Sequence, residues 1–194
     1  MHFLLIVLTA WMAAASPTRE QMKAAYDAHH GDFDYLLGDW EFTATNQQYG
    51  KFNGYWSAVR MADDGPILDE YRIVDEKGNT VYVTRTIRAY NASLNQWELI
   101  STDIGTGLQN FGTGQRAGGE MRIEQKFGVG TPTPSVSRIR YHDIKPDHFL
   151  WNADRSMDDG KTWTTNFQQI EARRIGPPRS MAPLTNRSQR SSAN

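Results

Sequence analysis

From residue 39 onwards, the chain alternates apolar and polar residues with a period of two, most regularly at residues 121–127. This alternation is typical of β-strands that have one buried and one solvent-facing side. Turn-forming stretches rich in Gly, Pro, Asp and Asn separate the alternating segments. The pattern predicts about ten strands, at residues 39–45, 53–61, 67–74, 80–90, 96–102, 108–113, 120–127, 136–144, 148–155 and 163–174.

Short strands joined mostly by tight turns predict an all-β fold, most directly an antiparallel up-and-down barrel. A two-sheet sandwich is the alternative. No segment between the strands has helical periodicity, which argues against a parallel α/β sheet. A short helix is expected before the barrel, at residues 18–30, because Thr18 and Gln21 fit a capping box. Phe33 and Leu36 follow it in an apolar turn that we expect to plug one end of the barrel.

The two ends of the chain differ in composition from the barrel sequence. Residues 1–15 combine a short apolar run with small residues at its end, which predicts a secretory signal cleaved near Ala15 or Ser16. The run is shorter than the ~20 residues of a membrane span, although a retained anchor is the alternative. The predicted organisation is therefore a signal (1–15), a helix and lead-in (16–32), a barrel domain (33–175) and a disordered tail (176–194).

Composition narrows the classes of function. The formal net charge is −1 and no basic cluster occurs, so nucleic acid is not an expected partner. The chain has no cysteine, which excludes disulfides and a thiol nucleophile. For an exported protein this suits a secreted or periplasmic location without a disulfide framework. No cofactor or metal site is predicted, because His29 and His30 beside Asp32 read best as a solvated loop.

Strand alternation also predicts which side chains face the interior. It places Arg85 inside, between Val83 and Ile87, where a guanidinium must be paired or hydrated. Arg85 is either an anchor for a carboxylate or phosphate group of a ligand, or the ion-pair partner of Glu70 or Asp69. The other residues predicted to contact a ligand provide aromatic surface and two orienting polar groups: Trp97, Phe127, Trp151, Phe167, Gln125 and Tyr141.

The segment that enters the first strand, Gly38-Asp39-Trp40, resembles the opening Gly-x-Trp of calycins, the group that includes lipocalins. The resemblance implies that Trp40 packs across one barrel end beneath an arginine of the last strand, for which Arg173 and Arg174 both qualify. The segments 33–40 and 156–163 are similar to uncharacterised exported bacterial proteins with a lipocalin-like barrel. That likeness covers roughly residues 31–175 and implies a fold without an established activity.

The segment 156–163 also matches the Ser-x-Asp-x-Gly-x-Thr-Trp pattern of the Asp box. We expect a hairpin turn in which Asp158 caps backbone donors, Gly160 takes a positive φ and Trp163 packs beneath. In sialidases this element occurs once in each propeller blade. Its single occurrence in a chain of 194 residues excludes a propeller.

Three functions remain open at this point. The first is a non-enzymatic module that binds a small, mostly apolar or amphipathic ligand inside the barrel. The second is a barrel isomerase or cyclase that uses Arg85 with Glu70 or Tyr141 as an acid–base pair. The third is a filled barrel that acts through its surface or tail. An inward carboxylate or histidine with a perturbed pKa would favour the enzyme.

Overall fold

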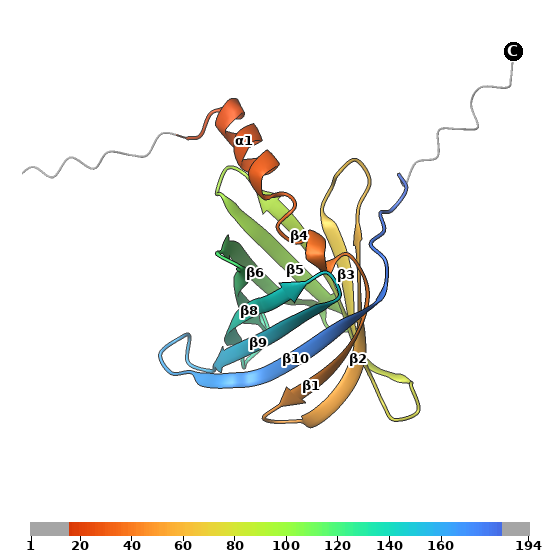
Figure 1. Ribbon diagram of the computed structural model, residues 1–194. Helices are drawn as coiled ribbons and strands as arrows, with labels where there is room; N and C mark the ends of the chain where they lie inside the picture. The colour runs from red at the N-terminus through yellow and green to blue at the C-terminus, as the bar shows by residue number, and fades with distance from the viewer. Residues whose placement is uncertain (1–15, 184–194) are drawn as a thin grey trace, which may run out of the picture.

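A computed structural model describes residues 16–183, so the predicted signal sequence lies outside the described residues. The fold is a closed barrel of ten antiparallel strands (Figure 1). Each strand pairs with its neighbours in sequence, and β1 pairs with β10 to close the barrel. This closure confirms the up-and-down barrel and excludes the sandwich. In residues 16–183, no helix has the length and apolar character needed to cross a membrane.

The elements fall close to the ranges predicted from the alternation, and strand ends extend by a few residues. They are α1 Arg19–His29, the 3₁₀ helix η1 Asp34–Leu36, β1 Gly38–Asn46, β2 Gly50–Arg60, β3 Ile67–Val74, β4 Thr80–Asn91, β5 Gln96–Asp103, β6 Gly107–Ala117, β7 Glu120–Phe127, β8 Ser135–Lys145, β9 His148–Ser156 and β10 Thr164–Gly176.

The lead-in closes one end of the barrel. Phe33 and Leu36, on either side of the start of η1, are fully buried in the aromatic core. The indole Nε1 of Trp40 donates to the carbonyl of Leu36 at 2.8 Å, which fixes this plug to β1. The guanidinium of Arg174 lies over the Trp40 ring, 4.1 Å from its centroid. Arg174 is therefore the stacking partner.

Arg173, the other candidate for this role, lies on the outer face of β10. Its side chain is exposed and pairs with Glu171 at 2.7 Å. Arg174 also donates to the carbonyls of Tyr35, at 2.9 Å, and of Leu37. Gly38 leaves room for this arrangement, because a Cβ atom there would lie 2.6 Å from Nη1 of Arg174. Of the two candidates, Arg173 is therefore excluded and Arg174 is the partner, because it lies one residue further along the strand and thus on its inner face.

Helix α1 begins with the expected capping box. The side chain of Thr18 accepts from the amide of Gln21, and the side chain of Gln21 accepts from the amide of Thr18. The helix projects beyond the plugged end of the barrel and has no fully buried residue (Figure 1). The rings of Tyr26 and His29 lie 6.4 and 5.4 Å from the ring of Tyr90 on β4. The remaining contacts at the C-terminal end of the helix are polar.

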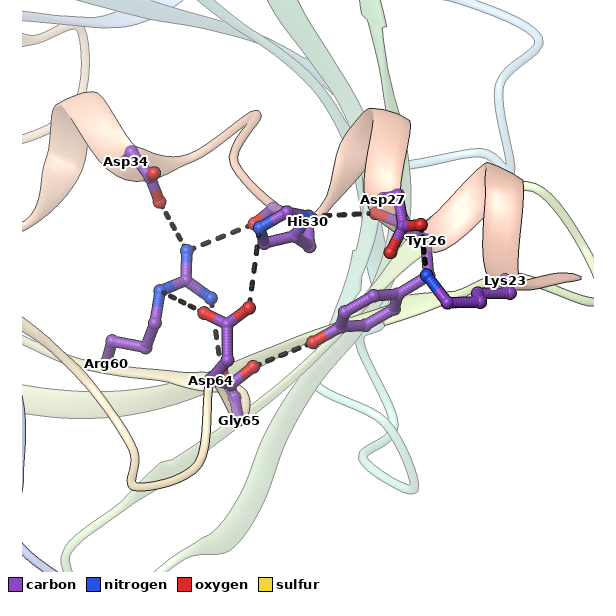
Figure 2. A network of polar contacts seen from close by, with 8 residues as sticks. All are labelled: Lys23, Tyr26, Asp27, His30, Asp34, Arg60, Asp64 and Gly65. Atoms are coloured by element: carbon purple, nitrogen blue, oxygen red, sulfur yellow. Dashed lines mark hydrogen bonds and ion pairs between the residues drawn. The ribbon is translucent and has the colours of Figure 1, made fainter.

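Those contacts converge on Arg60, at the end of β2 (Figure 2). Its guanidinium donates to the carbonyls of His30, at 3.0 Å, and of Gly65, at 3.2 Å, and pairs with Asp34. Tyr26 of α1 donates to the carbonyl of Asp64 at 2.7 Å. The network joins α1, the plug and the β2–β3 turn.

The segment after β10 differs from the expected disordered tail. Residues 177–183 lie along the barrel: Ser180 forms a parallel β-bridge with Arg60, and the amide of Met181 donates to the Arg60 carbonyl at 2.8 Å. Arg179 pairs with Asp39 of β1. The barrel domain thus extends past residue 176, and the rest of the predicted tail lies outside the described residues.

Candidate ligand site

The barrel encloses a cavity of about 620 Å³ that opens at the end opposite the plug. Its lining runs from Tyr49, 72% exposed in the β1–β2 turn, down to Trp56 and Asp69, which are buried. The floor touches the plug, because the Arg88 guanidinium lies 4.8 Å from the Phe33 ring centroid. The site is a cup with one mouth.

The floor is a buried polar cluster. Nε of Arg88 lies 2.5 Å from Oδ2 of Asp69, and the indole of Trp56 donates to Oδ1 of Asp69 at 2.8 Å. Nη2 of Arg88 donates to the hydroxyl of Tyr141 at 3.2 Å. Nη1 of Arg88 has no hydrogen-bond partner among residues 16–183. The Arg88–Asp69 ion pair has no net charge, and the Nη1 group of Arg88 remains available as a hydrogen-bond donor.

The protonation states of the floor follow from burial and from this ion pair. Burial alone would lower the pKa of Arg88, but the Asp69 carboxylate outweighs it and raises that pKa. Burial also raises the pKa of Tyr141, to about 12. At neutral pH, Arg88 is therefore charged and Tyr141 is a neutral phenol.

One wall of the cavity consists of small uncharged polar side chains on β4 to β8. The hydroxyls of Thr86 and Ser101, on paired strands, are 2.7 Å apart. The amide of Gln125 donates to Asn110 at 2.8 Å, and Ser137 lies opposite Gln125 on β8. We call these five residues the polar wall. It presents hydrogen-bonding groups along one side of the lumen.

The remaining surface of the cup is rich in aromatic rings, although Asn46 and Gln168 also line it. Phe52 and Tyr71 come from β2 and β3, whereas Trp151 and Phe167 come from β9 and β10. Burial raises the pKa of Tyr71, so its phenol is neutral and its ring stacks on Phe42 with centroids 4.8 Å apart. The cavity therefore has an aromatic side and a hydrogen-bonding side.

Most of the residues predicted to contact a ligand line this cavity: Gln125, Phe127, Tyr141, Trp151 and Phe167. Trp97 is buried but belongs to the core behind the plug, where it meets Phe33 edge-on at 4.9 Å. Their roles as ligand contacts stay predictions.

The predicted position of Arg85 is wrong. Its side chain is 46% exposed on the outer face of β4 and pairs with Glu70 at 2.8 Å. The alternation in this strand is inverted relative to the prediction, so Tyr82, Thr84, Thr86 and Arg88 line the cavity. The error has a physical reason: valine and isoleucine occupy the outer face of β4, while the lumen wall is polar.

Three charged residues line the cavity: Asp69, Arg88 and Arg155. The sequence prediction named Asp69 only as a possible partner of Arg85, and it missed Arg88 and Arg155. Arg155 carried a readable signal. It continues the inward series of Phe149, Trp151 and Ala153 by one further step of two along β9. Asp69 and Arg88 had none, because each lies in a strand where charged residues occur on both faces.

The β9–β10 turn has the geometry of an Asp box. Oδ1 of Asp158 accepts from the Thr162 amide at 2.9 Å, and Gly160 has φ +86°. Trp163 lies beneath the turn, donates to the Gly160 carbonyl at 3.0 Å and packs under Arg138 on the outside of the barrel. The turn is a structural element at the rim of the mouth.

The described residues 16–183 contain no group of three or more His, Cys, Asp or Glu side chains arranged to hold a metal ion. His29 instead lies 3.0 Å from Asp32, at the end of α1.

No protein family model matches the chain, and no curated protein matches it either. Among solved structures, it is similar to an S-type phycobiliprotein lyase, CPES, from Guillardia theta, with 14% identity over 74% of this chain and 90% of that one and a TM-score of 0.49. It is also similar to a redesigned β-barrel, mFAP1, bound to DFHBI, with 11% identity over 73% and 96% of the two chains and a TM-score of 0.37. A functional proposal therefore rests on the geometry of the cavity itself.

Proposed function

We propose that this protein binds a small molecule with a planar, largely apolar body inside its barrel. The observation that carries the proposal is the two-sided cup, with aromatic rings on one side and the polar wall on the other. A volume of about 620 Å³ lies within the usual range for small-molecule sites, roughly 300–1,000 Å³. A planar body would contact the rings with its faces and the polar wall with its edge.

Because of the polar wall, we expect an amphipathic ligand rather than a wholly apolar one. Uncharged hydroxyl and amide groups in a lumen that is open to water are hydrated when the site is empty. A wholly apolar ligand would displace that water without replacing its hydrogen bonds, which costs affinity. A ligand with one or two polar atoms along its edge avoids that loss.

The cavity supports binding better than catalysis. The pair assigned to an isomerase, Arg85 with Glu70, lies on the outer face of the barrel. Inside, both oxygens of Asp69 already accept hydrogen bonds, and Tyr141 holds its proton at neutral pH. None of the lining residues is a histidine. The lumen therefore offers no free acid–base group that would exchange a proton near pH 7.

A neutral fluorescent probe, pyrenebutanol, tests the proposal through a pair of variants at adjacent positions of β5. Ser101 faces the cavity, whereas Thr102 is exposed on the outside. Ser101→Trp fills the lumen, and we expect it to weaken probe binding by about tenfold or more. Thr102→Trp adds the same indole outside and should leave the affinity unchanged. Equal affinities in both variants, or no binding to the wild type, would overturn the proposal.

Identification of the natural ligand requires protein purified from its own host. Native mass spectrometry followed by denaturation and extraction would reveal a bound molecule and its mass.

We also propose export to the periplasm or the cell exterior, supported by the composition of residues 1–15. Cell fractionation and determination of the N-terminal residue test this: a start near Ser16 supports export with cleavage, and recovery only in the cytoplasm contradicts export.

A further inference from the structure

We propose that the ligand carries a carboxylate and that Arg155, at the mouth of the cup, binds it. This inference rests on the proposed function and specifies the class of ligand. Arg155 lies on β9, lines the cavity and is half-buried. Its guanidinium has no hydrogen-bond or ion-pair partner among residues 16–183, unlike the other arginine of the lumen.

The charges of the cavity point to an anion. Three charged residues line it, one carboxylate and two guanidiniums, so the lumen carries one net positive charge. Asp69 neutralises Arg88 at the floor, where their atoms approach to 2.5 Å. The uncompensated charge therefore lies at Arg155. A half-buried guanidinium without a partner gains more from an anion than a fully solvated one, because less water screens the pair.

The setting of Arg155 holds its donors in one orientation. The guanidinium lies over the ring of Phe167, 4.8 Å from the centroid, so the N–H groups extend from its edge rather than its face. Ser137 of the polar wall lies directly opposite Arg155 on β8 and can add a hydroxyl donor. Stacking removes much of the rotational freedom that a lysine at the same place would keep.

A carboxylate matches this site better than a phosphate. A guanidinium edge and a carboxylate are both planar and form two parallel hydrogen bonds. One carboxylate also balances the single excess charge, whereas a phosphate monoester would leave negative charge uncompensated in the mouth. The ligand would then lie with its apolar body towards Trp56 and Tyr71 and its acid group towards solvent.

Paired probes test the inference: pyrenebutyric acid and pyrenebutanol, which share the pyrene and the chain and differ in the carboxylate. Fluorescence titration at pH 7.5 should show that the wild type prefers the acid by about tenfold or more, the scale of a charge-assisted hydrogen bond. Arg155→Met should abolish the preference, because its affinity for pyrenebutyric acid should fall to that for pyrenebutanol. Arg155→Lys keeps the positive charge but loses the two parallel N–H donors of the guanidinium. It should retain a smaller preference for the acid.

Arg140→Met is the matched control, because it removes a positive charge from the exposed face of the neighbouring strand β8. It should leave the affinity for both probes and the preference for the acid as in the wild type. A wild type that binds both probes equally, or a preference that survives in Arg155→Met, overturns the inference but leaves lumenal binding in place. Failure of both probes to bind the wild type overturns the proposed function and this inference with it. Thermal melting of each variant verifies that it folds.

Discussion

Trp40 and Arg174 hold the closed end of the barrel through complementary surfaces. The indole ring is fully buried and offers its face to the guanidinium, while its N–H reaches the plug at Leu36. The guanidinium in turn uses its edge to donate to the carbonyls of Tyr35 and Leu37. Backbone carbonyls in and just after η1 are thus paired by one side chain.

Replacing Trp40 with alanine should therefore be costly. The substitution removes a buried aromatic ring and the hydrogen bond to Leu36, and we expect the free energy of unfolding to fall by ~3–5 kcal/mol. Urea denaturation followed by circular dichroism measures this loss. Tyr55→Ala on the outer face of β2 serves as the control, with an expected change of about 0.5 kcal/mol or less. An unchanged urea midpoint in Trp40→Ala would contradict the described closure.

Arg85 and Arg88 show what alternation can and cannot decide. A period of two separates the faces of β4, but the hydrophobicity of each face must then indicate which one is inside. In β4 the outer face carries Val83 and Ile87, and the inner face carries Thr84 and Thr86. A lumen lined by polar side chains on this side inverts the usual rule. In β7, where the inner face is apolar at Met121 and Ile123, the same reasoning gave the correct face.

At the scale of elements, the β9–β10 turn depends on one carboxylate. Asp158 is tied to the amide and hydroxyl of Thr162 and to the hydroxyl of Ser156. These hydrogen bonds, led by those from Thr162, lower the pKa of Asp158 from its usual 3.8 to about 2. The charged form is thus the one that the folded turn prefers.

The direction of the pH dependence follows. A carboxyl group whose pKa is lowered by folding contributes stability above its usual pKa, and that contribution disappears as the pH falls through the folded value. The turn should therefore loosen between pH 4 and about pH 2. Fluorescence of Trp163, beneath the turn, should report this loosening, and Asp158→Asn should lack that component. A wild-type signal with the same pH profile as the variant would refute the assignment.

The elements themselves were largely readable in the sequence. Turn residues such as Asp63, Asp64 and Asn95 adopt a positive φ between strands, as the composition of those stretches suggested. The pairing of Ser180 with Arg60 was not readable, because the proline-rich segment after Gly176 has no alternation. A single backbone bridge and the contact of Arg179 with Asp39 hold it, and neither leaves a pattern in the sequence.

At the scale of the whole molecule, Arg60 links three parts of the plugged end, which Tyr90 and Asp64 also join through Tyr26. It joins α1, the plug and the β2–β3 turn, although α1 itself buries no residue (Figure 2). The helix can therefore separate from the barrel without exposing a core. The plug, in contrast, is integral to the core through Phe33 and Leu36.

Arg60→Met should loosen α1 without loosening the barrel. Loss of the donors to His30 and Gly65 should speed amide hydrogen exchange in α1 by about tenfold or more, the range for hydrogen bonds to a charged group. Amides in the central strands should keep their wild-type protection. Lys23→Met, which removes an exposed charge from α1 itself, should change neither region. Loss of protection throughout the barrel would show that Arg60 supports the whole fold.

The pairing of β1 with β10 joins the first and last strands of the barrel, so the barrel closes late in folding. All other neighbouring strands are adjacent in sequence and can form local hairpins, but the free edge of β1 must wait for β10, the last strand of the barrel. Until then the sheet has two open edges, each able to pair with another chain. Premature termination before β10 would therefore produce a self-associating fragment rather than a smaller stable domain.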